Sequence, residues 1–388
     1  MIVGIDYTAA VWQGAGIGRY TRELVGATVA LGGPFRYVLF YAAGNRNRPP
    51  PFLDHLHHLC ADVPSVRVVP IPLSPRLLTI AWQRLRLPLY VEYFTGKLDI
   101  VHAPDFVLPP TRARTILTVH DLTFLLHPAC FAPSLHHYLS QAVPRSLEQA
   151  NLVLADSHAT RSDVIRLLPV TPERCVVVYP GVSPRFCPLP ASEVEPVRQQ
   201  LNLPRSFFLF VGTLEPRKNL VRLLEALARL APGAEGYDPA CETLVIAGRK
   251  GWLYEEIFAT MKRLRLEPRV RVMDFVDDEM LPSLYNLAGV FVYPSLYEGF
   301  GLPVLEALAC GTPVVTSAVA SLPEVAGDAA VLVNPHASEA IAAGMLQAQR
   351  DHERLRRAGP QQAQRFRWEP SARSLQDCYR QVYDASGE

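Results

Sequence analysis

The chain has 388 residues, which at roughly 100–200 residues per domain predicts two domains. Its 38 Lys and Arg residues balance 37 Asp and Glu residues, so no net basic field exists to hold nucleic acid, and we expect no nucleic-acid partner. Hydrophobic residues at 49% and charged residues at 19% exclude a disordered or low-complexity protein.

The N-terminus begins with a short apolar segment that meets a charge at Asp6 and lacks a basic leader. Since no apolar run reaches the ~18 residues of a membrane span either, we expect a cytoplasmic protein. The seven cysteines are scattered and never spaced Cys-x-x-Cys, which argues against a disulfide framework and a zinc site. No acidic pair follows a strand in the manner of a metal clamp, so we expect neither a metal nor a cofactor.

Short apolar runs alternate with amphipathic stretches along the whole chain, a pattern typical of parallel sheets with helical crossovers. We therefore predict two α/β halves. Strands are expected at 2–6, 37–41, 66–71, 99–102, 115–119, 152–155 and 176–179 in the first half, and at 207–212, 243–247, 270–275, 290–293, 313–316 and 330–333 in the second.

A segment near the middle of the chain, residues 179–190, contains four prolines and a glycine. These residues disfavour regular structure and suit an interdomain linker.

The segment of residues 74–88 is basic and amphipathic, with Trp82 among several leucines. It fits either contact with an anionic membrane surface or an arginine-rimmed helix packed on its own sheet.

The first glycine-rich loop, Gly14-Ala-Gly-Ile-Gly18, lies too far after the first strand for a dinucleotide fingerprint, and the second strand ends without an acidic residue. A nicotinamide-dependent dehydrogenase is therefore not expected. The loop opens a helix, so the backbone N–H groups there either receive an anion or a sugar hydroxyl or belong to a simple tight turn.

In the second half, a buried strand ends at Gly212 and a helix is expected after Pro216, with Arg217 and Lys218 in its first turn. Cations are disfavoured at a helix N-terminus because the helix dipole is positive there. Two cations in succession therefore indicate a negative group opposite them, such as a diphosphate. The alternative is a solvated Arg-Lys pair.

Residues 293–313 carry the most informative pattern, with Pro303 suited to the first turn of a short helix and Gly311 to its end. Glu298 then lies on the loop at the carboxyl end of a strand, the usual ligand edge of an open α/β sheet. Glu306 lies within the apolar helix, where a carboxylate needs a hydrogen-bonding partner, either a ligand hydroxyl or an internal group.

This segment resembles the Glu-x7-Glu motif of retaining nucleotide-sugar glycosyltransferases with the GT-B fold, glycosyltransferase family four. The resemblance extends over most of the chain. Besides Glu298 and Glu306, it covers residues 14–19, 118–121, 155–157, 179–182, 212–219, 246–248 and 275–281.

The resemblance implies a GT-B fold, in which two Rossmann-like doubly wound domains face each other across a cleft. The N-terminal domain, on the acceptor side, would comprise residues 1–183 and be completed by a C-terminal helix at 366–388. The C-terminal domain, on the nucleotide-sugar side, would comprise residues 184–365.

The resemblance also implies roles for individual residues. Arg217 and Lys218 would bind the donor diphosphate, Glu306 the ribose, and Glu298 the transferred sugar. His120 would face that sugar from the other domain, although a histidine at the end of a strand, taken alone, is more often structural. Further donor contacts would come from Gly16, Gly212, Gly248, Val276, Gly299, Phe300, Gly301 and Leu302.

The function implied is a metal-independent retaining hexosyltransferase of bacterial polysaccharide synthesis. It would move a hexose from a GDP- or UDP-linked donor to a glycan or lipid-linked sugar, at the inner face of the membrane if it contacts one. The residues around His120 look most like those of family members that use GDP-mannose. The alternatives are a GT-B phosphorylase or nucleotide-sugar epimerase, and a non-catalytic partner that binds nucleotide sugar.

Overall fold

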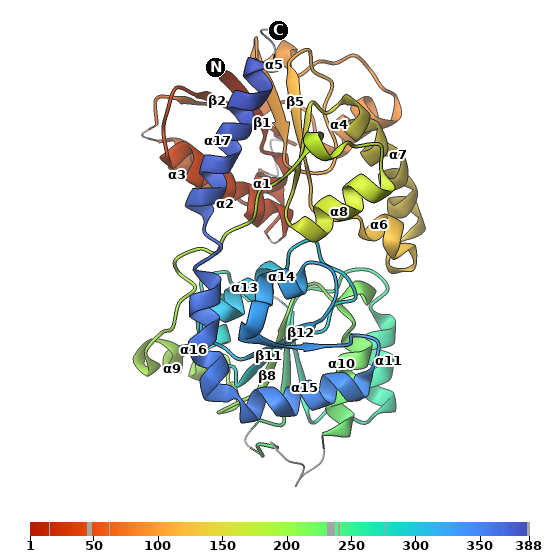
Figure 1. The fold of residues 1–388 in the computed structure, drawn as a ribbon, viewed down its shortest axis with the longest axis vertical. Helices are drawn as coiled ribbons and strands as arrows, with labels where there is room; N and C mark the ends of the chain where they lie inside the picture. The colour runs from red at the N-terminus through yellow and green to blue at the C-terminus, as the bar shows by residue number, and fades with distance from the viewer. Residues whose placement is uncertain are drawn as a thin grey trace. The chain divides into compact units, whose positions relative to one another are not determined.

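The computed structural model describes residues 1–14, 16–44, 49–61, 63–230, 237–239, 241–274 and 276–385. The chain forms two compact units (Figure 1). The first unit comprises Met1–Leu122, His137–Gly181 and the chain from Trp368 onward, and the second comprises Thr123–His136 and Val182–Arg367. Apart from an isolated bridge between Val182 and Arg367, residues 179–190 form no helix or strand.

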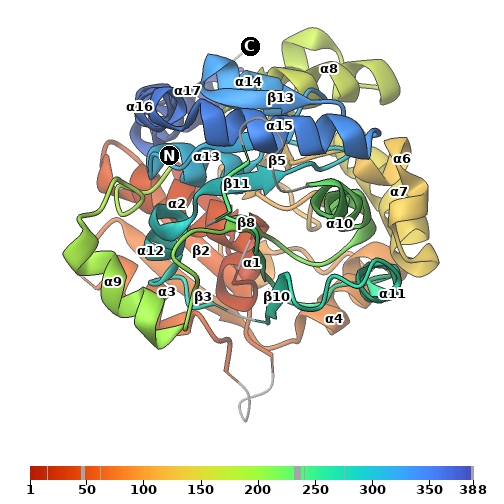
Figure 2. The ribbon, with the colours of Figure 1, turned by 90° about the horizontal axis from the view of Figure 1, so that it is seen from below.

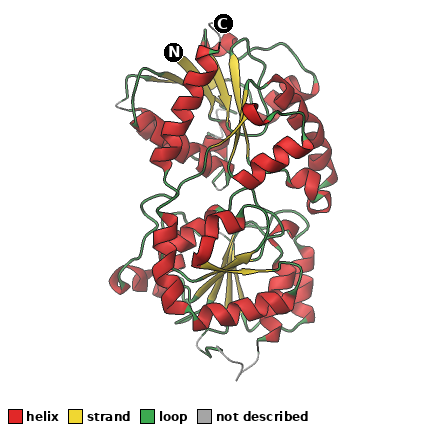
Figure 3. Cartoon of the chain, viewed as in Figure 1, coloured by secondary structure: helices red, strands yellow, loops and turns green. Residues whose placement is uncertain are grey.

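A parallel sheet with the strand order β3-β2-β1-β4-β5-β6-β7 forms the centre of the first unit. Helices surround it (Figure 3), and its central strands are buried along their whole length, as in β4 and β6, because both faces are covered. The strands are β1 (Ile2–Asp6), β2 (Arg36–Ala42), β3 (Val66–Ile71), β4 (Ile100–Ala103), β5 (Arg114–Val119), β6 (Leu152–Ala155) and β7 (Cys175–Val177).

The helices of the first unit include the last helix of the chain, α17 (Trp368–Asp384), which packs beside α2 (Ile17–Ala30) (Figure 1). Gln376 Nε2 donates to the carbonyl of Gly32 at 2.8 Å, and the Tyr379 hydroxyl lies 2.9 Å from His102 Nδ1. The other elements are α1 (Thr8–Trp12), α3 (Leu53–Cys60), α4 (Pro75–Leu78), the π-helical turn η1 (Thr79–Arg84), α5 (Glu92–Thr95), α7 (Pro133–Gln149), α8 (His158–Leu167) and η3 (Pro172–Arg174).

The second unit repeats this architecture with a parallel sheet in the order β10-β9-β8-β11-β12-β13. Its strands are β8 (Phe208–Val211), β9 (Leu244–Ala247), β10 (Val270–Met273), β11 (Val290–Tyr293), β12 (Val314–Ser317) and β13 (Ala330–Val333). Figure 2 shows α10 and α11 on one side of the sheet and α12 and α13 on the other. The helical elements are α6 (Thr123–Leu126), η2 (Pro128–Cys130), α9 (Ala191–Gln200), η4 (Pro216–Lys218), α10 (Leu220–Arg229), α11 (Glu255–Arg263), α12 (Leu281–Leu287), α13 (Leu302–Ala309), α14 (Leu322–Ala326), η5 (Gly327–Ala329), α15 (Ser338–Arg350) and α16 (His352–Ala363).

Both sheets reverse their direction of winding at one point. In the first, the chain builds outward from β1 to β3 and resumes on the other side of β1 with β4. In the second, it builds from β8 to β10 and resumes with β11. The crevice beyond the carboxyl ends of two such strands is where open α/β sheets bind ligands. We therefore expect a ligand site at each of the two switch points, β1/β4 and β8/β11.

The predicted doubly wound α/β class is confirmed, and each of the thirteen predicted strands is present in the described part of the chain. Their ends shift by a residue or two. The strand predicted at 176–179 ends at Val177, and the one predicted at 270–275 ends at Met273. Phe275 itself lies outside the described residues.

Candidate functional site

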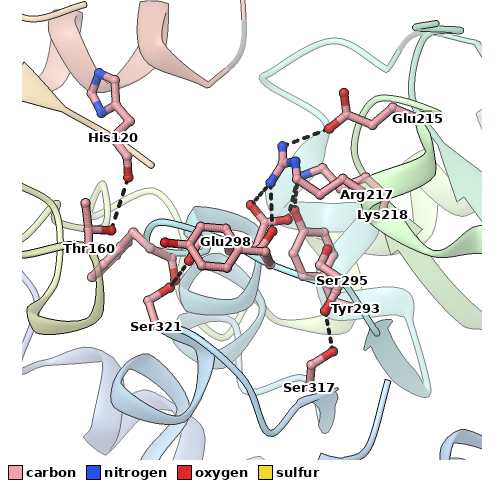
Figure 4. Close-up of polar contacts among 12 residues, drawn as sticks. His120, Thr160, Glu215, Arg217, Lys218, Tyr293, Ser295, Glu298, Ser317 and Ser321 are labelled. Atoms are coloured by element: carbon pink, nitrogen blue, oxygen red, sulfur yellow. Dashed lines mark hydrogen bonds and ion pairs between the residues drawn. The ribbon is translucent and has the colours of Figure 1, made fainter. Parts of the chain in front are cut away.

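The switch point of the second sheet brings together charged residues that are far apart in the sequence. Arg217 and Lys218 follow β8, and Glu298 follows β11. Arg217 Nη1 lies 2.5 Å from Glu298 Oε2, and Lys218 Nζ lies 2.6 Å from Glu298 Oε1 (Figure 4). Each oxygen of the carboxylate thus faces one cation.

Further polar groups hold the two cations in place. Arg217 Nη2 lies 2.8 Å from the Glu215 carboxylate, and Nη1 also donates to the carbonyl of Tyr297 at 3.0 Å. Lys218 Nζ donates to the Tyr293 hydroxyl at 2.6 Å. The side chains of Glu215 and Tyr293 therefore extend the cluster on either side, and its geometry is set by charge-assisted hydrogen bonds.

The charges of this cluster are strongly coupled because it is buried, with Glu298 and Lys218 each only 7% exposed. Burial alone would raise the pKa of Glu298, but Arg217 and Lys218 outweigh it and lower that pKa to about 2. Burial, assisted by Arg217, lowers the pKa of Lys218. Glu298 is consequently ionised at any physiological pH.

The local backbone differs from the expected helix. Arg217 and Lys218 do not form the first turn of α10 but lie in the separate 3-10 turn η4. Asn219, with a φ of 61°, interrupts the helical path, and α10 begins at Leu220. The Asn219 side chain stabilises this left-handed conformation by donating to the carbonyls of Pro294 at 2.9 Å and Pro335 at 2.7 Å.

The negative group expected opposite the two cations is, in this structure, the pair Glu298 and Glu215. The alternative of a solvated Arg-Lys pair is wrong for Lys218, which is buried. Binding of a diphosphate to these cations stays a prediction. A diphosphate would have to compete with Glu298 for Arg217 and Lys218.

The loop from Glu298 to α13 contains the predicted donor contacts Gly299, Phe300 and Gly301, and the fourth of this group, Leu302, is the first residue of α13. Ser321 Oγ lies 2.8 Å from the carbonyl oxygen of Glu298 and 2.9 Å from that of Phe300, so its single O–H proton is shared between them and fixes the loop. Gly301 has a φ of 105°, a conformation that favours glycine, and immediately precedes α13. Within α13, Glu306 is buried and accepts a hydrogen bond from the Tyr285 hydroxyl at 3.0 Å, so it has an internal partner.

Two more predicted donor contacts lie side by side because of the strand register. Val211 of β8 pairs with Ala247 of β9, so the next residues, Gly212 and Gly248, are neighbours at the carboxyl edge. A Cβ at residue 248 would lie only 1.8 Å from the carbonyl oxygen of Gly212, which only glycine can avoid. Val276 is buried in the segment after β10.

His120 belongs to the first unit, where it follows β5. Its Nδ1 lies 2.7 Å from Asp156 Oδ2, and its Nε2 lies 2.8 Å from the carbonyl oxygen of Pro104. Acceptors on both sides favour protons on both ring nitrogens, which is the imidazolium form, when Asp156 is ionised. Burial opposes this charge, but Asp156 outweighs it and raises the pKa of His120 to about 9.

Gly16, also in the first unit, precedes α2. The loop before it is held by Arg22, which donates to the carbonyls of Ala10 at 2.6 Å, Gln13 at 2.7 Å and Gly14 at 2.9 Å. These contacts support the tight-turn interpretation of the loop. Anion binding at Gly16 stays a prediction, and residue 15 lies outside the described residues.

Sequence reasoning did not single out Glu215, Tyr293 or Asp156 as site residues. A signal for Asp156 existed: Val119 pairs with Ala155 in the parallel register of β5 and β6, so the residues that follow these two must be neighbours. No comparable signal marks Tyr293, whose hydroxyl reaches Lys218 from the end of β11.

Neither a cluster of metal-ligating residues nor a helix long and apolar enough to cross a membrane occurs among the described residues.

Two protein-family models match the chain. The one described as Glycosyltransferase Family 4 matches residues 14–186, and the one described as Glycosyl transferases group 1 matches residues 192–365. An Escherichia coli protein named O-antigen chain mannosyltransferase B is 34% identical over 374 residues, covering 94% of this chain and 96% of the relative. This chain is a family-four glycosyltransferase.

The glycosyltransferase is also similar to the O-antigen chain mannosyltransferase RfbU of Salmonella typhimurium, with 26% identity over 73% of this chain and 74% of the relative. Among solved structures, it matches the sucrose-phosphate synthase of Thermosynechococcus elongatus with a TM-score of 0.76 and 22% identity, over 99% of this chain and 100% of that one. Anabaena HepE, solved in complex with UDP and glucose, matches with a TM-score of 0.73 and 21% identity, over 97% of this chain and 98% of HepE. These likenesses confirm the GT-B fold.

Proposed function

We propose that this glycosyltransferase transfers a mannosyl group from GDP-mannose to a saccharide acceptor, with retention of anomeric configuration and without a metal ion, in bacterial polysaccharide synthesis. The names of its Escherichia coli and Salmonella relatives support the choice of sugar and of process. The observation that carries the proposal is the buried cluster of Arg217, Lys218 and Glu298 at the β8/β11 switch point.

Cleavage of the sugar–phosphate bond leaves negative charge on the departing nucleoside diphosphate. In a metal-independent reaction, protein cations must stabilise that charge, and Arg217 and Lys218 are held in a low-dielectric site suited to it. When the diphosphate takes over these cations, the Glu298 carboxylate becomes available to accept hydrogen bonds from hydroxyls of the transferred sugar. Donor binding and placement of Glu298 are therefore one event.

Retention follows if the acceptor attacks from the face that the phosphate leaves and a phosphate oxygen accepts the acceptor proton. No side chain need then act as nucleophile or general base.

We further propose that Glu306 contacts the ribose. The Tyr285 hydroxyl holds one carboxylate oxygen of Glu306 by a hydrogen bond of 3.0 Å. The remaining donor contacts are the backbone at Gly16, Gly212, Gly248, Val276 and the loop from Gly299 to Leu302.

His120 is proposed to contact the transferred sugar from the first unit. Both of its N–H groups already have acceptors, Asp156 and the carbonyl of Pro104. A sugar hydroxyl would therefore replace the Pro104 carbonyl at Nε2, while the Nδ1 contact to Asp156 keeps the ring charged and oriented.

The first unit is proposed to bind the acceptor and to contact a membrane surface. Of the eight large hydrophobic side chains that are exposed among the described residues, four lie between residues 77 and 93. Leu85 is 63% exposed and stands between the exposed arginines Arg84 and Arg86. Exposed leucines flanked by arginines suit the interface of an anionic bilayer, where a lipid-linked acceptor would reside.

The test is incubation of the purified protein with GDP-mannose, UDP-glucose and other nucleotide sugars, with and without methyl α-D-mannopyranoside and with EDTA. The proposal predicts a mannoside product from GDP-mannose in EDTA, with an α-anomeric signal retained in its NMR spectrum. An epimerase would instead change the sugar of the donor alone, and a phosphorylase would require inorganic phosphate. Absence of both transfer and donor hydrolysis would leave only a nucleotide-sugar-binding partner.

A further inference from the structure

A short segment of the chain just after His120 belongs to the second unit, although the chain before and after it belongs to the first. This segment, Thr123–His136, contains α6 and η2. Trp252 holds it on the second unit: its Nε1 donates to the carbonyl of Cys130 at 2.6 Å, and its ring lies 6.0 Å from the ring of Phe131. The segment therefore packs against the loop that follows β9.

The segment places His127 next to the cluster of Arg217, Lys218 and Glu298. The centroid of the His127 ring lies 5.9 Å from that of the Tyr297 ring. The carbonyl of the same Tyr297 accepts a hydrogen bond from Arg217 Nη1 at 3.0 Å. His127 thus reaches the edge of the cluster through a residue that also holds one of its cations.

A second histidine, His336, lies in the turn after β13. It directly follows Pro335, whose carbonyl accepts a hydrogen bond at 2.7 Å from Asn219, two residues beyond Arg217. Burial lowers the pKa of His127, and the charges of His336 and Arg217 lower it further. The two histidines and the arginine are therefore close enough to repel one another when all are charged.

The two imidazole rings have hydrogen-bonding capacity that the described part of the protein does not use. Neither ring makes a hydrogen bond or an ion pair with a described residue. Glu215 raises the pKa of Cys130 in the same segment, where burial also keeps the thiol uncharged, but no described carboxylate shifts the pKa of His127. Free imidazoles beside an arginine, without a carboxylate of their own, favour a bound anion.

The histidines are also more accessible than the cations of the cluster. His336 is exposed and His127 is half-buried, whereas Lys218 is buried. Arg217 and Lys218 are in addition each paired with one oxygen of Glu298. A phosphate arriving from solvent therefore meets free N–H donors on the histidines before it meets a free cation.

We propose that His127 and His336 form an outer phosphate site, which holds the diphosphate of the nucleotide sugar while it displaces Glu298 from Arg217 and Lys218. That the ligand is a donor diphosphate rests on the proposed transferase function, whereas the site itself requires only a phosphate group. A bound phosphate favours the imidazolium form of both rings, because its charge offsets the repulsion from Arg217. The rings take up protons from solvent as the phosphate arrives and release them when it moves on.

The first experiment measures association and dissociation of N-methylanthraniloyl-GDP with the full-length protein by stopped-flow fluorescence, at pH 6 and pH 8. His127→Phe keeps an aromatic ring against Tyr297 and removes both N–H groups, and His336→Gln removes only the charge. At pH 6, association with His127→Phe should be roughly 10-fold slower than with the wild type, the equivalent of a hydrogen bond to a charged group. At pH 8, where the rings are neutral, the difference should fall to about threefold or less. His336→Gln should show the same trend.

The dissociation constant separates this role from a structural one. Since the histidines hold the phosphate only during the exchange, dissociation should slow by the same factor as association and leave the dissociation constant unchanged. A weaker dissociation constant with unchanged association would mean that the substitution damages the cluster itself, and it overturns the outer site. The matched control is His352→Gln, which removes a histidine of the same unit that lies 3.7 Å from Glu353 and should change neither rate constant.

The second experiment needs no nucleotide: ¹⁵N NMR of the histidine rings during titration with inorganic phosphate at pH 7, with signals assigned from the two variants. Both rings should shift towards the imidazolium form. If they do and no mannose is transferred from GDP-mannose, the outer site stands and only the proposed function fails. If transfer is found but neither ring responds to phosphate and the rate constants of His127→Phe match those of the wild type, the outer site alone is overturned.

Discussion

Replacement of Glu298 by Gln separates two roles of the cation cluster. In the wild type, Glu298 neutralises Arg217 and Lys218 in a buried site. The difference between its pKa of about 2 and the ordinary value of 4.5 corresponds to about 3 kcal/mol of stabilisation. Because the pKa is lowered on folding, this stabilisation is fully present above pH 4.5 and disappears as the pH falls towards 2. At pH 7, Glu298→Gln should therefore lose all of it.

The consequence for melting is large enough to measure easily. For a unit of this size, about 3 kcal/mol lowers Tm by roughly 6–12 °C. The control is Glu339→Gln, which breaks the exposed ion pair with Arg229 and should cost at most about 1 kcal/mol. The difference in stability between wild type and Glu298→Gln should shrink below pH 4.5, whereas a mere packing defect would persist there.

The affinity for GDP should rise in Glu298→Gln, although the stability of the variant falls. Without the Glu298 carboxylate, a diphosphate has no competitor for Arg217 and Lys218. GDP should therefore bind roughly 10- to 150-fold tighter to Glu298→Gln, by the ~1.5–3 kcal/mol of a charged hydrogen bond. Turnover should nevertheless fall, because the contact to the transferred sugar is lost. Calorimetric titration with GDP checks this. If Glu298→Gln leaves Tm unchanged and GDP affinity unchanged or weaker, Glu298 does not occupy Arg217 and Lys218 in the place of the diphosphate.

Three other predictions follow from the structure. Arg217→Ala or Lys218→Ala should lower kcat by ~10²–10³ with the circular dichroism spectrum retained; a variant that keeps more than about a tenth of wild-type turnover contradicts the assigned role. The His120 imidazolium should persist at neutral pH and titrate near 9 in ¹⁵N NMR. Because folding raises the pKa of His120, the stabilisation from its charge is fully present below pH 6.5 and is lost as the pH rises through 9. A titration below pH 7 would disprove the charged ring. The double variant Leu85→Ser, Leu87→Ser should sediment several-fold less with phosphatidylserine-containing vesicles than the wild-type protein does, with binding to neutral vesicles unchanged. Equal sedimentation of the variant and the wild type argues against the membrane surface.

The strands could be predicted from sequence because parallel strands buried on both faces are continuous apolar runs, and these runs are bounded by turn residues. The contact of His120 with Asp156 could also have been predicted, since it needs only the assumption that β5 and β6 are neighbours in register. The turn at Pro216–Lys218 could not. It depends on Asn219, whose side chain reaches two carbonyls supplied by distant segments, at Pro294 and Pro335.

The identity of the group opposite Arg217 and Lys218 shows the same limit. Sequence logic correctly required a negative charge there but could not determine whether the protein or a ligand supplies it. Glu298 is 80 residues from Lys218 in the chain and reaches it only because β8 and β11 are adjacent at the switch point. Tertiary adjacency of this kind decides charge pairing, and local periodicity carries no information about it.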